Sequence, residues 1–585
     1  MKPETLENRQ LLAANIFHNE AMPEDVNQDN QITPLDALTI INQVRRQSVR
    51  GFNAAVDDGP TAANANGRMM DVNDDGRITP LDALIIINRL RRDGPGEIQS
   101  DRGSDDSSVP STELKADSSA ESPDVVLAWN ESFGEILADS QSDQQTPGFA
   151  SRAMAMLNLA IYDAVGIATD GSNAETFYNY DIRLGRATEV STEIAASQAA
   201  FTVLSGLYPE QKATLDALRA EAILGAATDR ITEASLSIGS EIGNTILAIR
   251  SSDGSDVIGE YEYADQLGSF QADPLHPDVP AWGPAWGNVD PFAIHSVEEF
   301  SPPSTPDLTS DQYADSYNEV LALGGLESVG RTADQTEAGL FWAYDRDGLG
   351  TPLALYNDVL LQIAEQQGNT LEENAALFAQ ASVAMADAAI VAWDTKFGEN
   401  FWRPVTAIRS GDFDGNGATE GDADWIALGA PNGEDRTGFT PQFPTYISGH
   451  ATFGGALFGT LQEFYGTDDI AFELASDELE VLLDNPDLQA AYGLDLDDAT
   501  RSFESLSEAM AENGRSRVYL GIHFDFDDTV GQEVGQAVAA SVVGEFALTS
   551  TETKENERNQ TIRHPSTDRF AAVDEVFRSR RHRGF

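Results

Sequence analysis

Apolar side chains recur with the period of an α-helix through most of the chain after residue 123. Met154, Leu157, Ile161 and Val165 fall on one helical face, because an α-helix turns once in about 3.6 residues. The same periodicity continues in the stretches 189–207, 211–224, 228–250 and 353–396. No alternating pattern typical of β-strands competes with it. We therefore predict one large all-α domain over 124–548, a helical bundle for which two stacked four-helix bundles are one arrangement.

Two parts of the chain interrupt this periodicity. Residues 251–310 are irregular and carry Trp282 and Trp286 in the sequence AWGPAWGNVDPF, so we expect a long loop that covers the helical body. Residues 549–585 form a polar tail whose last ten residues contain four arginines and no acid. A disordered tail and a basic anchor both fit this segment.

The composition limits what the protein binds. The 585-residue chain is 41% hydrophobic and 23% charged, which suits a folded protein of about three or four domains. Its 97 acidic residues outnumber 36 basic ones, so the net charge is −61. This charge argues against nucleic acid or an anionic membrane as a partner, since both are negative. The sequence also lacks an apolar run of about 18 residues that would predict a membrane span.

The chain contains no cysteine, so disulfides, thiolate metal sites and cysteine nucleophiles are excluded. Residues 1–19 do not have the basic and apolar regions of a standard signal peptide. They contain LENRQLLA at 6–13, which resembles the LExRxLLA motif near the start of many planctomycete extracellular proteins. The resemblance implies an exported protein, secreted or held at the cell surface. An ordinary helix start is the alternative.

An internal repeat occupies residues 20–92. DVNQDNQITPLDALTIIN and DVNDDGRITPLDALIIIN begin 46 residues apart, at Asp25 and Asp71. Each copy spaces oxygen ligands as a calcium-binding loop that leads into a helix does, with a backbone carbonyl at the seventh position. The predicted calcium ligands are Asp25, Asn27, Asp29, Gln31, Thr33 and Asp36 in the first copy and Asp71, Asn73, Asp75, Arg77, Thr79 and Asp82 in the second.

The paired loops resemble type I dockerin repeats. The last ligand is Asp in place of the usual Glu, and Asn30 replaces the turn glycine that Gly76 supplies in the second copy. The resemblance implies a small α-helical calcium module that docks to a cohesin-like protein, and acidic loops without metal are the alternative. Residues 93–123 are rich in Ser, Asp, Pro and Gly and have no aromatic residue, which is typical of a flexible linker.

Basic and histidine side chains gather in the second half of the helical domain. Lys396 and Arg403 are seven residues apart in WDTKFGENFWRP, a spacing that places both on one side of a regular helix, although Gly398 and Pro404 indicate a nearby helix end. Another pair, in SRVYLGIH, comprises Arg517 and His523. Their spacing of six requires a bend, which we expect at Gly521, before both can point inward.

The third segment, FPTYISGHATFGGAL, places Ser448, Gly449 and His450 before a small-residue helix expected to begin near Ala451. A hydroxyl and free backbone N–H groups at a helix start form an anion cradle. With two arginines and a lysine, this segment predicts a site for a highly charged tetrahedral oxyanion. Two histidines remain, one for acid–base work and one as nucleophile or metal ligand. Separate salt bridges and a simple helix cap are the alternative reading.

The combination K-x6-RP, SGH and SR-x5-H resembles the superfamily of vanadium-dependent haloperoxidases and phosphatidic-acid-phosphatase-type enzymes. The resemblance to fungal-type vanadium chloroperoxidases extends over residues 330–545 and, more weakly, over 124–330. It includes FWAYDRDGLGTPLALYN, DWIALGAPN and SRVYLGIHFDFD. One departure is Ile447, which stands where that family usually has proline; we expect it to loosen the turn without removing a ligand.

The resemblance implies a role for each matching residue. Lys396, Arg403, Ser448, the Gly449 amide and Arg517 would hold the vanadate oxygens, and Lys396 would also polarise peroxide. His523 would bind vanadium, and His450 would handle the proton of the apical hydroxide. Trp393 and Phe443 would line the halide side, and Asp345 would pair with Arg517.

The implied activity is oxidation of bromide, and of chloride as well, by hydrogen peroxide to hypohalous acid, which halogenates an organic acceptor. A phosphatase that uses His523 as nucleophile is one alternative, and an inactive calcium-dependent docking or adhesion protein is another. Residues 412–424 have calcium-like spacing at first but lack the last acid, so we interpret them as an acidic loop. The other histidines have no recurring spacing and are expected to be structural or exposed: His18, His276, His295, His564 and His582.

Overall fold

The structure is a computed structural model. It describes residues 124–548, except 141–143, 172–173, 175, 181, 183–188, 225–228, 265, 347 and 432–437, together with 31–32 and 96–97. The chain divides into two compact units, Met1–Ala120 and Glu121–Phe585. In the first unit the described residues form an antiparallel pair, β1 (Gln31–Ile32) and β2 (Gly96–Glu97). The strand β2 lies inside the predicted linker, so that Gly96–Glu97 is paired where we expected flexible chain. The predicted calcium ligands other than Gln31, the rest of the predicted linker and the polar tail lie outside the described residues.

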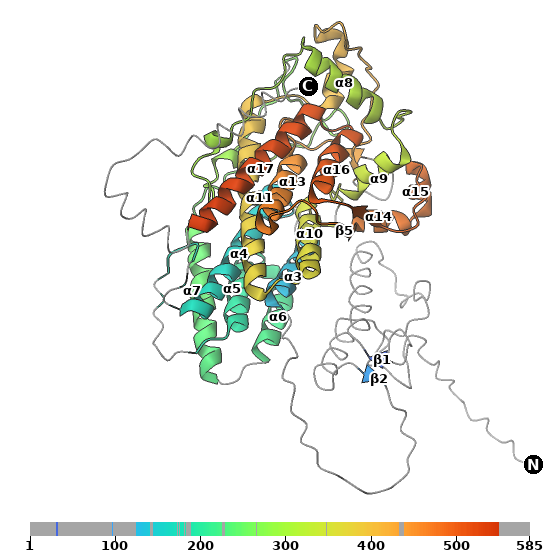
Figure 1. The fold of residues 1–585 in the computed structure, drawn as a ribbon. Helices are drawn as coiled ribbons and strands as arrows, with labels where there is room; N and C mark the ends of the chain where they lie inside the picture. The colour runs from blue at the N-terminus through green and yellow to red at the C-terminus, as the bar shows by residue number, and fades with distance from the viewer. Residues whose placement is uncertain are drawn as a thin grey trace, which may run out of the picture. The chain divides into compact units, whose positions relative to one another are not determined.

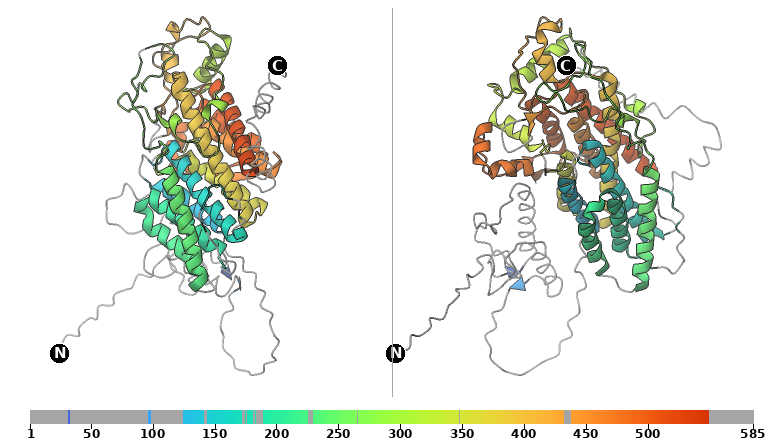
Figure 2. Two further views of the ribbon diagram at one scale, coloured as in Figure 1. Left: turned by 90° about the vertical axis from the view of Figure 1, so that its left-hand side faces the viewer. Right: turned by 180° about the vertical axis from the view of Figure 1, so that it is seen from behind.

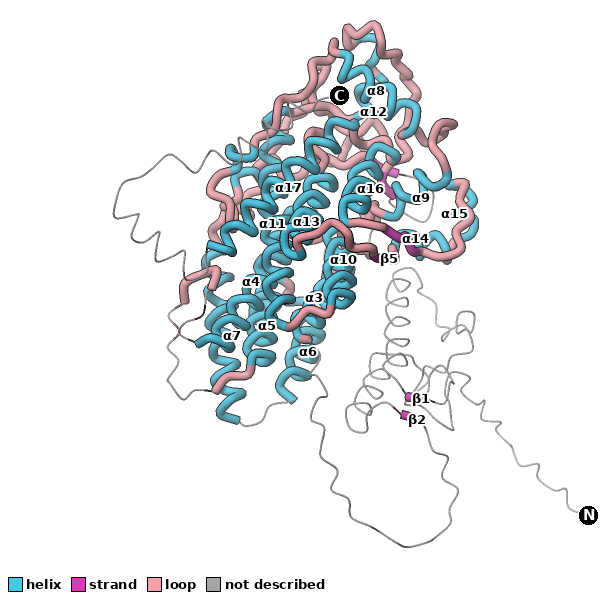
Figure 3. The backbone as a smooth tube through the Cα atoms, in the orientation of Figure 1, coloured by secondary structure: helices cyan, strands magenta, loops and turns pink. Residues whose placement is uncertain are grey.

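The described part of the second unit is mostly helical, as predicted (Figure 3). The helices are α3 (Val125–Asp139), α4 (Pro147–Asp170), α5 (Thr192–Leu207), α6 (Lys212–Leu224), α7 (Asp229–Arg250), α8 (Asp311–Leu323), α9 (Ala333–Phe341), α10 (Pro352–Gln367), α11 (Leu371–Glu399), α12 (Pro404–Arg409), α13 (Gly449–Tyr465), α14 (Asp477–Leu483), α15 (Pro486–Tyr492), α16 (Leu506–Tyr519) and α17 (Asp525–Leu548).

Local sequence signals explain where the long helices begin and end. The predicted stretch 353–396 is two helices, because Gly368 adopts the left-handed conformation that ends α10. Thr370 and Glu373 then form a capping box that starts α11. The apolar face predicted around Met154 and Ile161 is buried in α4.

The long α11 joins two groups of packed helices. It packs on α4, which in turn packs on α5 beside α7, and it also packs on α13 and α17, which lie against each other. Figures 1 and 2 show the cyan and green helices α3–α7 on one side of the yellow α11, with the orange and red helices α13, α16 and α17 on the other. One described helix, α11, has the length and apolar composition to cross a membrane, but 89% of its most apolar window is buried inside the fold. This degree of burial is typical of a helix in the core of a folded domain.

Residues 251–310 form the predicted irregular cover and contain the short 3-10 helices η3 (Trp286–Asn288) and η4 (Val297–Phe300). The Asp387 carboxylate on α11 accepts hydrogen bonds from the backbone N–H groups of Phe292, Ala293 and Ile294, at 2.6–2.9 Å. Trp282 packs edge to face on Trp393 of the same helix, with ring centroids 5.4 Å apart. The cover is therefore attached directly to the helix that carries Lys396.

Four short strands add two hairpin-like pairs that the periodicity did not predict. β3 (Ala430–Pro431) pairs with β4 (Gly438–Phe439), and β5 (Phe472–Ala475) pairs with β6 (Thr500–Phe503), both antiparallel. The second pair encloses α14 and α15. At two to four residues each, these strands are too short to show an alternating pattern in the sequence.

Candidate functional site

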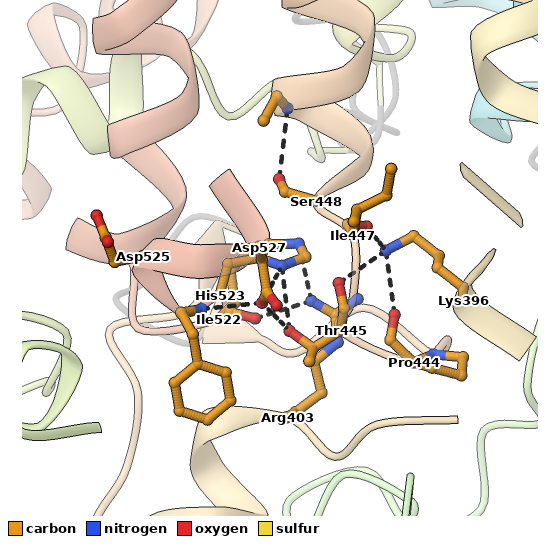
Figure 4. A network of polar contacts seen from close by, with 12 residues as sticks. Lys396, Arg403, Pro444, Thr445, Ile447, Ser448, Ile522, His523, Asp525 and Asp527 are labelled. Atoms are coloured by element: carbon orange, nitrogen blue, oxygen red, sulfur yellow. Dashed lines mark hydrogen bonds and ion pairs between the residues drawn. The ribbon is translucent and has the colours of Figure 1, made fainter. Parts of the chain in front are cut away.

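The ends of four helices bring Lys396, Arg403, Ser448 and Arg517 together. Lys396 lies in the last turn of α11, Ser448 is the N-cap of α13, and Arg517 lies in the last turn of α16. Arg403 is the N-cap of α12, so the two cations do not lie on one regular helix, and α11 ends between them, as Gly398 and Pro404 indicated. Asn400 ends α11 in the left-handed conformation, and the chain turns before Arg403. Both cations are nevertheless buried and directed to the same region (Figure 4).

The Lys396 ammonium group is fully buried and donates hydrogen bonds to three backbone carbonyls. Its Nζ donates to the carbonyl oxygens of Pro444, Thr445 and Ile447, at 3.1, 3.0 and 2.5 Å (Figure 4). Burial, followed by the nearby Arg403 charge, lowers the pKa of Lys396 well below its ordinary value. The Ile447 side chain, at the position where the family usually has proline, is also fully buried, and its carbonyl accepts from Lys396.

Two buried guanidinium groups carry donors without a partner in the described structure. Arg403 donates Nε to the Phe443 carbonyl at 2.9 Å and Nη1 to the Ile522 carbonyl at 2.8 Å, while Nη2 is unpaired. Arg517 donates Nη2 to Asp345 Oδ2 at 2.8 Å, which confirms the predicted pair, and its Nε and Nη1 are unpaired. A buried unpaired donor costs free energy, so these three groups indicate a missing anionic acceptor.

The bend that brings His523 beside Arg517 occurs at Gly521, as predicted. Gly521 has φ of +75°, and a Cβ atom there would lie 2.2 Å from the Gly324 carbonyl oxygen. Only glycine fits, because it tolerates positive φ and has no side chain. Arg517 and His523 therefore lie on opposite sides of a tight turn between α16 and α17.

Three polar groups fix the His523 ring. Nδ1 lies 2.9 Å from Asp527 Oδ2 and 3.1 Å from Thr445 Oγ1, and Nε2 lies 3.0 Å from Arg403 Nη1 (Figure 4). A carboxylate can only accept and a guanidinium can only donate. His523 therefore carries its proton on Nδ1 and presents the Nε2 lone pair toward the arginine.

Asp527 and Thr445 were not predicted as site residues. Asp527 is fully buried and accepts hydrogen bonds from the Thr445 hydroxyl and from the Phe524 N–H as well as from His523. Burial raises the pKa of Asp527 to about 6 despite these donors. A carboxylate four residues after a histidine at a helix start was a usable signal, because that spacing places both on one helical face. Nothing in the sequence pointed to Thr445.

His450 lies in the first turn of α13 and has the opposite tautomer. Its Nε2 is 3.0 Å from the Trp342 carbonyl oxygen, which can only accept, so the proton is on Nε2 and Nδ1 carries the lone pair. Burial, followed by the charge of Arg517, lowers the pKa of His450 well below its ordinary value. The neutral imidazole can therefore act as a proton acceptor.

Ser448 and Gly449 form the start of α13, two residues earlier than expected. The Ser448 side chain accepts a long hydrogen bond of 3.4 Å from the Ala451 N–H, which leaves its hydroxyl proton to donate elsewhere. A Cβ atom at Gly449 would lie 3.5 Å from the Trp393 ring, so the main chain runs close beside that indole.

Trp393 and Phe443 make an aromatic wall, with ring centroids 4.9 Å apart. The ammonium of Lys396 and the guanidinium of Arg403 each lie 5.1 Å from the Phe443 centroid, within cation–π range. Both aromatic residues line a small pocket together with Asp345, Gly449, His450, Arg517, His523, Pro147, Pro352, Pro441 and Phe453. Lys396, Arg403 and Ser448 are buried and do not line it.

The donor set fits vanadate. Three unpaired guanidinium nitrogens, the charge of a buried ammonium and a helix start suit the oxygens of a tetrahedral oxyanion. The unprotonated Nε2 of His523, which faces Arg403, is the kind of nitrogen that binds a metal centre. Phosphate has the same shape and charge and fits the same donors.

The remaining candidates do not join this site. Asp414 accepts from the Thr419 hydroxyl and the Asn416 N–H, so the 412–424 loop uses its own acid for internal hydrogen bonds. His276 pairs with Asp273 at 2.9 Å, and His295 is exposed. His18, His564 and His582 lie outside the described residues.

Two kinds of comparison bear on the family. Residues 376–549 match the family described as the VCPO second helical-bundle domain, and residues 23–91 match the dockerin type I domain. Vanadium chloroperoxidase of Curvularia inaequalis is 31% identical over 469 residues, which cover 66% of this chain and 76% of that protein.

Solved structures share the fold. A bacterial vanadium-dependent iodoperoxidase has a TM-score of 0.55 at 22% identity, covering 72% of this chain and 95% of that one. A bacterial vanadium-dependent chloroperoxidase in its holo form also has a TM-score of 0.55, at 15% identity, covering 71% of this chain and 96% of that one.

Proposed function

Because this chain belongs to the vanadium haloperoxidase family, we propose that it uses bound vanadate to oxidise halide with hydrogen peroxide. The product is hypohalous acid, which halogenates an organic acceptor. The observation that carries the proposal is the set of three unpaired guanidinium nitrogens near the buried His523 ring, whose Nε2 lone pair faces Arg403.

The chain's own residues bind and orient the oxyanion. Arg403 and Arg517 would donate to its oxygens, with the Ser448 hydroxyl and the Gly449 amide as further donors. Lys396 would contribute its positive charge, because its three N–H groups already donate to backbone carbonyls. Asp345 fixes the Arg517 fork through Nη2 and leaves two donors directed elsewhere. When bound, vanadate supplies Lewis-acid activation of peroxide toward halide without a change in its oxidation state.

The two histidines divide the remaining work. Asp527 holds the Nδ1 proton of His523, which keeps the Nε2 lone pair available as the vanadium ligand. The Nδ1 lone pair of His450 would accept a proton from incoming peroxide, since its Nε2 donates to the Trp342 carbonyl.

Halide approaches along the aromatic wall. Trp393 and Phe443 are apolar and lie beside the buried cations, which suits a large, weakly hydrated anion. We propose that bromide is oxidised and that chloride is oxidised as well.

We propose that the first unit directs the enzyme out of the cell and attaches it to a partner protein. The dockerin match at residues 23–91 supports two calcium ions bound by the loop residues named above and docking to a cohesin-like protein. With the motif at 6–13, it supports export to the cell surface or the medium.

One assay tests the proposed function. The protein is incubated with vanadate, hydrogen peroxide and bromide in the presence of a phenol-type halogen acceptor, and separately with a phosphate ester in place of peroxide. We expect halogenation that requires vanadate and is lost in His523→Ala. The His523 Nε2 lone pair would equally suit a nucleophile, so phosphate release without halogenation would favour the phosphatase instead.

A further inference from the structure

A short segment between α9 and α10 makes two direct contacts to the active site. We call residues 341–346 the strap. Its Trp342 carbonyl accepts from His450 Nε2 at 3.0 Å, which sets the tautomer of that histidine. Its Asp345 carboxylate accepts from Arg517 Nη2 at 2.8 Å, which orients the guanidinium. The geometry of two site residues therefore depends on where the strap lies.

The strap is anchored on its other side by consecutive residues at the start of α14. The Ser476 hydroxyl donates to the Phe341 carbonyl, and the Asp477 N–H donates to the Tyr344 hydroxyl, both at 2.8 Å. Glu478 Oε1 accepts from Arg346 Nε at 3.0 Å and from Nη2 at 2.5 Å.

The pair between Glu478 and Arg346 is enclosed within the fold. Glu478 is 0% exposed and Arg346 is 7% exposed, so each charge depends on the other for compensation. Arg346 adjoins Asp345 in the chain. A displacement of the Arg346 side chain would therefore move the carboxylate that holds Arg517.

We propose that Glu478 is a positioning residue of the oxyanion site and acts through Arg346 on the strap. Its carboxylate fixes Arg346, and the strap then presents Asp345 to Arg517 and the Trp342 carbonyl to His450. Tyr344 supports the same arrangement, because it adopts a positive φ of 47° that an ordinary residue holds only when its surroundings enforce it. The inference rests on the proposed function for the identity of its ligand.

The test measures oxyanion binding rather than turnover. Vanadate, and separately inorganic phosphate, are titrated into the full-length protein while tryptophan fluorescence reports the dissociation constant. Loss of a hydrogen bond that supports a ligand-binding residue commonly lowers affinity by about 10–100-fold. We therefore expect Glu478→Gln to raise the dissociation constants of vanadate and of phosphate by roughly tenfold.

Loss of one partner of a buried ion pair also destabilises the fold, so a second variant separates the two effects. The double variant Arg346→Met with Glu478→Leu replaces the pair by apolar side chains of similar volume. We expect it to keep a native-like melting temperature and still bind both anions roughly tenfold more weakly.

Asp253→Asn is the matched control. Asp253 is also buried and pairs with Arg152 at 2.7 Å and Arg250 at 2.9 Å, but it has no contact with the strap. We expect a lower melting temperature and native anion affinity. Native affinity in the double variant, or equal weakening in Asp253→Asn, would overturn the positioning role. If the unaltered protein bound phosphate but not vanadate, the proposed function would be rejected and the positioning role of Glu478 would still be tested with phosphate.

Discussion

At the scale of single residues, the two site histidines are held in opposite tautomers by groups that can act in only one way. The Trp342 carbonyl can only accept, so His450 keeps its proton on Nε2. Asp527 accepts at Nδ1 of His523, and Arg403 donates at Nε2. One histidine is thus prepared to accept a proton and the other to act as a ligand, before any anion is bound.

This division predicts the effect of Asp527→Asn. An amide can present its NH₂ group to Nδ1 and so favour the wrong tautomer, with the proton on Nε2. We expect vanadate affinity to fall by about 10–100-fold, the usual effect of losing a partner behind a metal ligand. Equilibrium titration with vanadate checks it. Asp525→Asn is the control, because Asp525 is half-exposed and pairs with Arg515 instead; equal losses in both variants would contradict the tautomer argument.

A second prediction concerns pH. The pKa of His450 is held well below 6.5 by burial and by Arg517, whereas the unfolded chain titrates near 6.5. Below about pH 6.5 His450 is therefore protonated in the unfolded state but not in the folded state, so the free energy of unfolding decreases as pH falls. We expect His450 to contribute a loss of up to about 1.4 kcal/mol per pH unit in this range.

Urea unfolding of the anion-free protein at pH 7.5 and 5.5 measures this contribution. The variant His450→Gln removes the titrating ring while keeping a polar side chain. It should lose less stability over the same interval than the native protein. Equal losses would show that His450 titrates normally in the folded state.

The residue types of the site were predictable, but their supports were not. Basic residues and histidines are rare in so acidic a chain, so a group of them at family-like spacings is informative. The structure brings all five together: Lys396, Arg403, His450, Arg517 and His523. The Trp342 and Ile447 carbonyls hold two of them, and a backbone carbonyl has no signature in a sequence. Thr445 acts only through a contact formed by folding.

At the scale of elements, α11 connects the site to the irregular cover. The helix presents Lys396 and Trp393 to the pocket region and Asp387 to the 292–294 backbone. Asp387 is fully buried, and burial raises its pKa to about 6 although three N–H donors oppose the shift. A single carboxylate thus secures the segment whose Trp282 packs against the Trp393 indole.

We predict that Asp387→Asn detaches part of this cover. An amide has one acceptor oxygen for three donors, and each buried donor left unpaired costs about 1–3 kcal/mol. The folded state binds a proton at Asp387 more readily than the unfolded state, so this group stabilises the fold at low pH and the stabilisation is lost as pH rises through about 6. The stability deficit of the variant should therefore be about 1 kcal/mol smaller at pH 7 than at pH 5.

Urea unfolding at both pH values checks this prediction, with Glu372→Gln as a control on the same helix. Glu372 is exposed, so its replacement should change stability by no more than about 0.5 kcal/mol. A deficit in Asp387→Asn that does not change with pH would mean that the carboxyl stays ionised throughout.

Helix periodicity was a good guide to the core and a poor guide to its connections. The stretches around α4, α5, α6 and α7 were placed within a few residues, because buried apolar faces fix them. The spacing of Lys396 and Arg403 misled, since it assumed one helix where Asn400 ends α11. The β5–β6 pair depends on contacts between distant segments that local sequence does not encode.

At the scale of the whole molecule, a chain of net charge −61 surrounds a buried group of cations. The acidic surface repels anions at long range, while the arginines attract them at short range. Salt screens charges separated by more than about 10 Å at 0.1 M, so the repulsion is weakened more than contacts inside the pocket. The site therefore works against the field of the protein that contains it.

The division into two compact units leads to a final prediction. The helical unit, Glu121–Phe585, contains every residue of the oxyanion site, so the fragment 121–585 should bind vanadate with the dissociation constant of the full chain. Under our proposal the dockerin-like loops bind calcium when folded, so calcium should raise the melting transition of residues 1–120 in the full chain, by an amount that grows with calcium concentration. Calorimetry of the full chain, of the fragment and of an Asp25→Ala, Asp71→Ala variant distinguishes these transitions. A chelator that abolishes vanadate binding by the full chain would instead couple the calcium loops to the active site.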